Sequence, residues 1–294
     1  PALNLLKKAI EKKAAELRGF CKTGRTHLMD AMPIRLDQTL LGWGGQVNGN
    51  IHLLEQISPS LQVLALGGTA VGTGINTHPD FSKTFVTLLS ERTGVSFQTT
   101  SNFFPLMGSQ DTAVALSGHL KTTAVSIMKI ANDLRWMNSG PLSGLGEISL
   151  EALQPGSSIM PGKVNPVIPE AAAMVAAEVI GNDSTITVAG QSGNFELNVM
   201  LPLIAYKIII SLELISNISI LLANKCIKTF RVNQENINSA LHRNPILVTA
   251  LNPVIGYAKA AEIAKKAYRE NQPIIDVAES ETDLSRKELE RLLD

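Results

Sequence analysis

Three stretches, at about residues 37–66, 109–138 and 199–227, place apolar side chains at helical spacing over a long run of chain. At 1.5 Å per residue these helices would be roughly 40 Å long, well beyond the usual globular helix. Helices of that length usually belong to a bundle or lie between subunits. Shorter helical patterns lie near residues 2–20, 79–93, 166–181, 233–242, 248–270 and 285–293. Strand alternation is scarce, so the sequence predicts an all-α fold built on a long central helical bundle.

Changes in composition along the chain predict where the helices and domains end. Gly181-Asn182 follows the pattern at 166–181 and is a plausible C-terminal stop. Near Arg231 the long apolar patterns give way to shorter, more charged helices. We therefore predict a central helical-bundle domain over residues 1–232 and a small C-terminal helical domain over residues 233–294. A helical pattern is already running at Pro1, so we expect the chain to begin inside a longer protein.

Charge and hydropathy exclude several partners. Lys and Arg total 26, as do Asp and Glu, so no net field attracts nucleic acid or an anionic membrane. The most apolar stretch, from Leu201 to Ile227, contains three charged residues, which leaves no uncharged run of the roughly 18–20 residues that span a bilayer. It predicts a buried helix instead.

Cysteine and histidine usage argues against a disulfide framework and a metal site. Cys21 and Cys226 are far apart and form no ligand-spaced cluster, which favours a reducing compartment. The histidines show no HExxH or comparable spacing. The sequence therefore predicts no metal and no cofactor.

The segment from Gly156 to Asn165, GSSIMPGKVN, is a polar loop that leads into an apolar helix. Ser157 and Ser158 supply hydroxyls, Lys163 a positive charge and Asn165 an amide donor. The first turn of the following helix would add free N–H groups and a positive dipole end. The segment therefore predicts a carboxylate-binding loop, although a plain serine-rich loop with Asn165 as a helix N-cap explains the spacing equally well.

A second polar cluster runs from Lys22 to Asp30. Within it His27 could act as a general acid or base near neutral pH, and Thr26 could donate a hydrogen bond to substrate. The alternative, a structural histidine in a loop, stays open. Glu170 could orient a histidine, but nothing in the sequence alone brings it to His27.

Two further segments are rich in glycine. Residues 67–74 lack the GK[ST] and GxGxxG patterns of nucleotide loops, so they predict a tight turn with close backbone packing. Residues 190–198 are compatible with a flexible joint or a substrate-facing loop, and composition does not choose between them.

Several of these segments together resemble one known superfamily. Residues 156–165 match the signature GSSxMPxKxN, and similar blocks stand at 23–31 (TGRTHLMDA), 67–77 (GGTAVGTGINT) and 193–199 (GNFELNV). On these residues, and on 247–265, the chain resembles the fumarase/aspartase superfamily, most closely the class II, iron-independent fumarate hydratases. No block of the family's N-terminal domain is present in the sequence.

The resemblance implies an assembly and a reaction. Members are homotetramers with a core of long helices, and each active site draws loops from three subunits. They hydrate fumarate to L-malate reversibly, a step of the tricarboxylic acid cycle, by anti addition and elimination through an aci-carboxylate intermediate, without a cofactor. The resemblance also implies a cytoplasmic location, or the mitochondrial matrix if the source is eukaryotic.

The resemblance further implies a role for each matching residue. Ser157 would be the base that takes the C3 proton, and neighbouring N–H groups and Lys163 would stabilise its alkoxide. His27, paired with Glu170, would activate the water. The residues expected to bind the substrate carboxylates are Thr26, Ser158, Lys163, Val164 through its backbone, and Asn165.

Two alternatives remain beside the hydratase. An aspartate ammonia-lyase would resemble the chain in residues 156–165, but aspartases tend to carry GQLEL where this sequence has GNFEL at 193–197. A non-catalytic structural protein, like some lens crystallins of the superfamily, would need none of the matching site residues.

Overall fold

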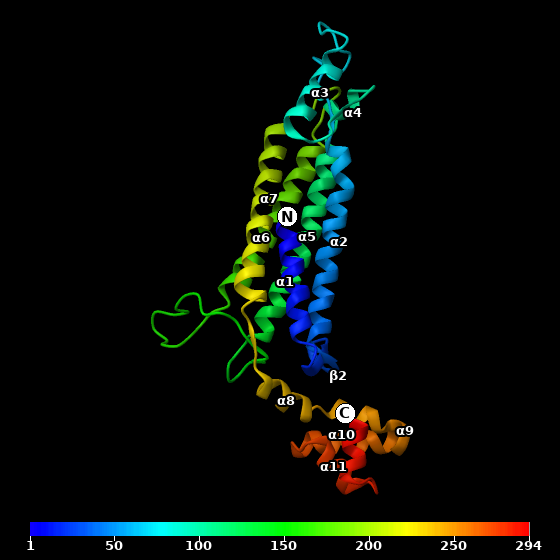
Figure 1. Ribbon diagram of the computed structural model, residues 1–294, viewed down its shortest axis with the longest axis vertical. Coiled ribbons are helices and arrows are strands. Elements are labelled where there is room, and N and C mark those ends of the chain that lie inside the picture. Colours follow the sequence, from blue (N-terminus) through cyan, green and yellow to red (C-terminus); the bar gives the residue numbers. More distant parts are fainter. Residues whose placement is uncertain (294) are drawn as a thin grey trace. The chain divides into compact units, whose positions relative to one another are not determined.

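The computed structural model describes residues 1–293 and is mostly α-helical, which confirms the predicted fold class (Figure 1). The long helices are α2 (Leu36–Leu61), α5 (Asp111–Met137), α6 (Val167–Gly190) and α7 (Leu201–Leu222), the last continued by a π-helical turn, η1 (Ala223–Ile227). The shorter ones are α1 (Ala2–Glu16), α3 (Phe81–Thr93), α4 (Phe104–Gly108), α8 (Gln234–His242), the 3₁₀ helix η2 (Pro245–Leu251), α9 (Asn252–Ile255), α10 (Tyr257–Glu270), α11 (Ile274–Glu281) and α12 (Arg286–Leu293).

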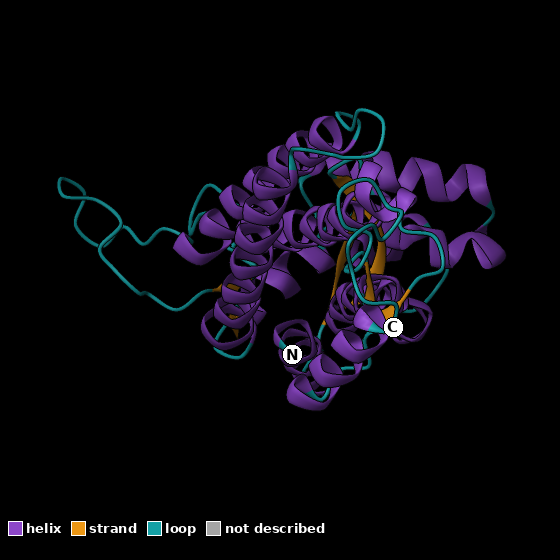
Figure 2. Ribbon diagram, turned by 90° about the horizontal axis from the view of Figure 1, so that it is seen from above, coloured by secondary structure: helices purple, strands orange, loops and turns teal. Residues whose placement is uncertain are grey.

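The strands of the described chain form three two-stranded sheets, short elements among the helices (Figure 2). An antiparallel hairpin joins β1 (Cys21–Thr26) to β2 (Met29–Arg35). A parallel pair joins β3 (Val63–Leu64) to β4 (Gln98–Thr99). A second antiparallel pair joins β5 (Ile148–Ser149) to β6 (Arg231–Val232). The hairpin contains the polar cluster at residues 22–30, for which the sequence predicted no strands.

The chain forms two compact units, each assembled from separate stretches. The first holds Pro1–Ala9, Trp43–Arg135 and Ala152–Lys228, and the second holds Ile10–Gly42, Trp136–Glu151 and the described residues from Thr229 on. These units are defined by contacts rather than by chain continuity. The predicted domains 1–232 and 233–294 therefore stay a prediction.

Buried polar contacts join the long helices of the first unit, which run side by side in Figure 1. Between α2 and α5, Asn50 Nδ2 donates to Ser126 Oγ at 2.9 Å. Between α5 and α6, the buried Asp183 carboxylate accepts from Ser117 Oγ at 2.7 Å and from Lys121 Nζ at 2.6 Å. Since an unpaired buried carboxylate is costly, these contacts favour one packing register of α5 on α6.

Helix α6 continues past Gly181-Asn182, so the predicted stop there is wrong. The Asn182 side chain is buried, and its Nδ2 donates to Ser211 Oγ of α7 at 3.2 Å. Further along, Ile186 packs in an apolar cluster with Ile204 of α7. Burial against α7 thus outweighs the cost of about 1 kcal/mol that glycine brings to a helix interior.

Helix α7 is apolar on two faces. One face is buried, through Ile204, Ser211, Ile215, Ile218, Ser219 and Leu222. The other exposes Tyr206 and Ile209, by 59% and 54%. By length and composition alone, the stretch Leu201–Ile227 is long and apolar enough to cross a membrane. Within the chain, 28% of its most apolar segment is buried. The predicted buried helix is therefore buried on one face only.

The C-terminal helices of the second unit share one apolar core. Its buried members are Val248, Leu251, Ala260, Ile263, Ala267, Ile274, Val277, Ala278 and Leu289. The range 248–270, expected as one helix, holds the end of η2, then α9, and then α10, and the break between α9 and α10 lies at Gly256, whose φ of +78° suits glycine. Helix α11 was not predicted from the sequence.

Glu281, at the end of α11, makes this core sensitive to acid. Lys266 Nζ lies 2.6 Å from Oε1 and Lys259 Nζ lies 3.0 Å from Oε2. The hydrogen bond from Lys266, followed by that from Lys259, lowers the pKa of Glu281 from 4.5 to about 2. Because the folded pKa lies below the unfolded one, Glu281 stabilises the fold above about pH 4.5 and loses that effect as the pH falls toward 2.

We expect the free energy of unfolding, measured by urea denaturation, to fall more steeply between pH 4.5 and pH 2 in the native protein than in Glu281→Gln. Glu262→Gln, which removes a carboxylate that is 72% exposed and 3.7 Å from Lys259, serves as the control and should follow the native curve. Parallel curves for Glu281→Gln and the native protein would contradict the assignment.

Candidate active site

The signature loop, residues 156–165, precedes α6 and is closed at its neck by hydrogen bonds within the loop. The Gly156 N–H donates to the Lys163 carbonyl at 2.8 Å, and Asn165 Nδ2 donates to the Gly156 carbonyl at 3.0 Å. A Cβ on Gly156 would stand 2.6 Å from the Lys163 oxygen, so a larger residue would force the neck apart. The residues between are thereby held as one compact loop.

Ser157 sits at the start of this loop, half-buried, and its hydroxyl oxygen accepts two backbone hydrogen bonds. The donors are the N–H groups of Ile159, at 3.2 Å, and Met160, at 3.1 Å. Both dipoles point their positive ends at Oγ, so they favour a negative charge on that oxygen. The surroundings of Ser157 therefore suit a hydroxyl that has to become an alkoxide.

An open hollow of about 490 Å³ lies against the loop. Ser157, Met160, Lys163 and Val164 line it together with neighbouring residues between 152 and 164. Ser158 and Lys163 are exposed, so a hydroxyl and an ammonium group are accessible from solvent. The hollow thus offers a small anion a cation and a serine oxygen within the same loop.

The start of α6 offers fewer donors than the sequence suggests. Pro166 is the N-cap, so Asn165 does not play that part. The Val167 N–H donates to the Asn165 carbonyl at 2.9 Å, the Glu170 N–H donates to the Pro166 carbonyl at 3.0 Å, and Pro169 has no N–H. Glu170 itself lies half-buried in this first turn. The donors of the site are therefore mainly those of the signature loop.

Thr26 and His27 lie at the tip of the β1–β2 hairpin. The strands meet at the pair Thr26 and Met29, so the turn consists of His27 and Leu28, with φ of +56° and +61°. A two-residue turn with both φ positive normally contains Asn or Gly, and other residues are strained in it. All four tip residues are exposed.

The structure brings some of the predicted site residues together. Ser157, Ser158, Lys163, Val164 and Asn165 share the signature loop of the first unit. Glu170 is in the same unit, whereas Thr26 and His27 belong to the second. The predicted pairing of His27 with Glu170, and of Thr26 with the loop, stays a prediction.

Close packing or hydrogen bonds hold both glycine-rich segments in the structure. In residues 67–74, Gly67 has a φ of +109°, and a Cβ on Gly68 would meet Met107 Sδ at 2.5 Å, which confirms close packing in a turn. In residues 190–198, the fully buried Asn198 donates through Nδ2 to the carbonyls of Ala189 and Gly190, and its N–H donates to Met107 O at 2.9 Å. Hydrogen bonds of Asn198 therefore hold residues 190–198 in place.

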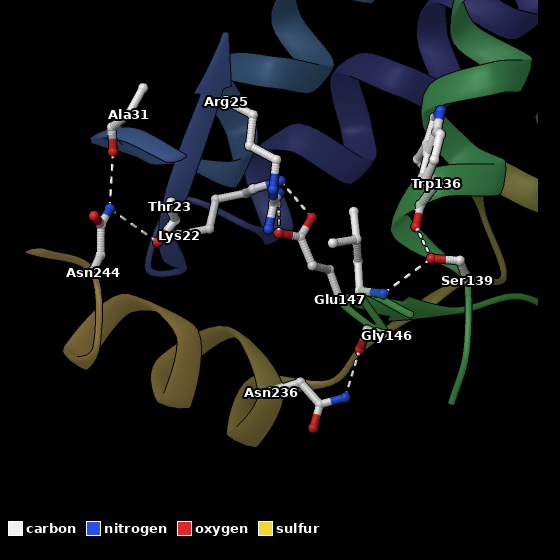
Figure 3. A network of polar contacts seen from close by, with 11 residues as sticks. Lys22, Thr23, Arg25, Ala31, Trp136, Ser139, Gly146, Glu147, Asn236 and Asn244 are labelled. Atoms are coloured by element: carbon white, nitrogen blue, oxygen red, sulfur yellow. Dashed lines mark hydrogen bonds and ion pairs between the residues drawn. The ribbon is translucent and has the colours of Figure 1, made fainter. Parts of the chain in front are cut away.

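One set of residues near the hairpin was missed by the sequence reasoning. Glu147 is buried, and its carboxylate accepts from Lys22 and Arg25 of β1 (Figure 3). The available signal was a single acidic residue in the otherwise uncharged run from Leu145 to Leu150. A buried carboxylate needs a partner.

In the part of the chain that the structure describes, no three His, Cys, Asp or Glu side chains gather as metal ligands would.

Comparison with known proteins places these features in a family. Residues 1–181 match the lyase family, and residues 247–294 match the fumarase C C-terminus. The chain is 66% identical over 295 residues to fumarate hydratase class II 2 of Pseudomonas aeruginosa. It is 47% identical over 299 residues to fumarate hydratase class II of Mycobacterium tuberculosis. These alignments cover the whole chain and 64% and 63% of the two relatives, so the chain spans less than two thirds of their length.

Solved structures give the same result for the fold. A recombinant class II fumarase from Schistosoma mansoni superposes with a TM-score of 0.95 at 33% identity. The fumarate lyase:delta crystallin from Brucella melitensis bound to cobalt does so with a TM-score of 0.95 at 42% identity. Each superposition covers 100% of this chain and 64% of the other, which confirms the predicted type of helical bundle. With more than half of its length matched by the family, the chain belongs to the lyase family.

Proposed function

We propose that this protein is a class II fumarate hydratase, which converts fumarate and water to L-malate and back. The observation that carries the proposal is Ser157 Oγ, which two backbone N–H groups stabilise inside the signature loop. The names of the relatives support the same reaction, because both curated relatives above are called fumarate hydratase class II.

In the dehydration direction, Ser157 starts the reaction as the base. Its alkoxide takes the C3 proton of L-malate, and the electron pair of that C–H bond moves into the adjacent carboxylate to give an aci-carboxylate dianion. The N–H groups of Ile159 and Met160 make the alkoxide accessible, since they stabilise its negative charge. Lys163, which lines the same hollow, adds a positive charge.

The dianion is the species that the site has to stabilise. Ser158, Lys163, Asn165 and the Val164 N–H are the donors of the loop, and Thr26 joins them from the hairpin. A donor fixed in place before the reaction is worth about 3–4 kcal/mol when it is removed singly. The hydrogen bonds from Gly156 to the Lys163 carbonyl and from the Asn165 side chain to Gly156 fix the backbone of the loop and the Asn165 amide in advance.

His27, paired with Glu170, protonates the hydroxide that leaves C2, so that water departs and fumarate remains. This step requires the hairpin tip and the start of α6 to meet. A homotetramer in which three subunits share each site provides for that, and the exposed apolar face of α7 around Tyr206 and Ile209 supports such an assembly. We further propose a cytoplasmic location, or the mitochondrial matrix in a eukaryote; the exposed free thiol of Cys21 is consistent with either.

The reaction is tested by incubating the complete gene product with L-malate and, separately, with L-aspartate, and following fumarate by its ultraviolet absorbance. We expect fumarate from L-malate alone. Fumarate from L-aspartate alone would identify an ammonia-lyase, and no fumarate from either substrate would favour a structural protein on the same scaffold.

Ser157→Ala should lower turnover by about 10²–10⁴-fold or more, because the base is lost while the loop neck stays intact. Turnover is measured with the complete gene product, and light scattering checks that its assembly is unchanged. Ser158→Ala is the matched control: it removes a carboxylate donor, and we expect a smaller loss. Undiminished turnover in Ser157→Ala would rule out the serine base.

His27→Asn should lower turnover by about 10²-fold, at the lower end of the range expected for Ser157→Ala, because water can partly replace the lost proton donor. His52→Asn, which changes an exposed histidine of α2, is the control, and we expect native turnover from it. Native turnover in His27→Asn would count against this role of His27.

A further inference from the structure

We propose that Glu147 is a positioning residue for the hairpin tip: its carboxylate holds β1 through Lys22 and Arg25 and thereby sets where Thr26 and His27 lie. The inference rests on the proposed function, because it assigns a support to the group that handles the water. It concerns a residue that lies in neither the signature loop nor the hairpin.

The contacts of Glu147 use both oxygens of a carboxylate that is only 4% exposed. Lys22 Nζ lies 2.5 Å from Oε2, and Arg25 Nη1 lies 2.6 Å from Oε1 (Figure 3). The two cationic side chains are themselves 7% and 18% exposed. Charge-assisted hydrogen bonds in such surroundings are short and directional, so the geometry of β1 follows that of Glu147.

The shape of β1 at this place allows both cations to reach one carboxylate. Residues three apart on a regular strand point to opposite faces of the sheet. Here the pairing with β2 shifts register between Thr23 and Arg25, and such a bulge re-aims the side chains beside it. Gly24 occupies the irregular position, where a Cβ would stand 2.6 Å from the Met32 carbonyl oxygen.

The hairpin tip depends on this support because little else holds it. His27 and Leu28 have positive φ, a strained conformation that persists only where the surrounding structure imposes it. Within residues 1–293, the side chains of Thr26 and His27 make no hydrogen bond. Besides Glu147, Asn244 ties the strands, donating through Nδ2 to Thr23 Oγ1 at 3.3 Å and to the Ala31 carbonyl at 2.9 Å.

Glu147 is itself fixed by its backbone. Its carbonyl accepts from the Asn233 N–H at 2.9 Å, and the preceding carbonyl, of Gly146, accepts from the side chains of Asn233 and Asn236 at 2.8 and 2.9 Å. The next residue begins β5. These hydrogen bonds hold the backbone that carries the Glu147 carboxylate, as a positioning residue requires.

The experiment is a double-mutant cycle in the complete gene product. Glu147→Gln keeps the shape of the side chain and removes its charge, and we expect kcat/KM for L-malate to fall by about 10²-fold, mainly through kcat. If Glu147 acts through His27, then Glu147→Gln combined with His27→Asn should lose about as much as His27→Asn alone, not the roughly 10⁴-fold product of two independent losses. Glu147→Asp, which restores the charge, should recover part of the activity.

Asp183→Asn is the matched control, because Asp183 is another buried carboxylate held by a lysine and a second donor. It should lower the melting temperature and leave kcat per folded protein unchanged. If Glu147→Gln does not fold, Arg25→Lys takes its place in the cycle, since it keeps a cation at the more exposed position.

Native kcat in the folded variant, additive losses in the cycle, or a behaviour equal to that of Asp183→Asn would each overturn the positioning role. These outcomes are distinct from failure of the proposed function, which would appear as absence of malate turnover in the native protein. Absence of malate turnover in the native protein would therefore contradict the positioning role as well.

Discussion

Helix length is the constraint on which the rest of the first unit depends. Helices α5 and α7, of 27 and 22 residues, carry apolar side chains on more than one face. The inward faces meet within the chain, but Val125 of α5, Val188 of α6 and Ile209 of α7 are each more than half exposed. Apolar surface repeated along several helices is typical of an interface, which supports the assembly from several copies that we propose above.

The polar groups inside the bundle determine how its helices align. Apolar side chains alone would tolerate a slip by one helical turn at moderate cost, whereas the Asp183 carboxylate would then lose Ser117 and Lys121 while still buried. The contact of Asn182 with Ser211 has the same effect between α6 and α7.

The long helices could be predicted from the sequence because their periodicity is a local property. The ranges expected for α5 and for α7 with η1 agree with the structure to within two residues, whereas α2 ends five residues earlier than expected, before β3, and α6 continues past the expected end at glycine. Gly181-Asn182 has the composition of a helix end, but α6 continues through it because Asn182 is buried against α7. No local sequence pattern indicates that burial. The β1–β2 hairpin was missed for a related reason: Lys22, Thr23 and Gly24 are buried in succession, so the strand shows no alternation.

The signature loop and the β1–β2 hairpin also differ in how far their structure depends on local sequence. The signature loop is closed by bonds among residues 156–165, so a short run of sequence contains nearly all that shapes it, and a motif can identify it. The hairpin has a recognisable motif too, but its support comes from Glu147, which stands 122 residues beyond Arg25 and 125 beyond Lys22. A motif therefore identifies the group at the hairpin tip without revealing what holds it, and only the folded chain connects the two. Residues that position a catalytic group from such a distance are to be sought among buried charges whose partners lie at the root of a functional loop.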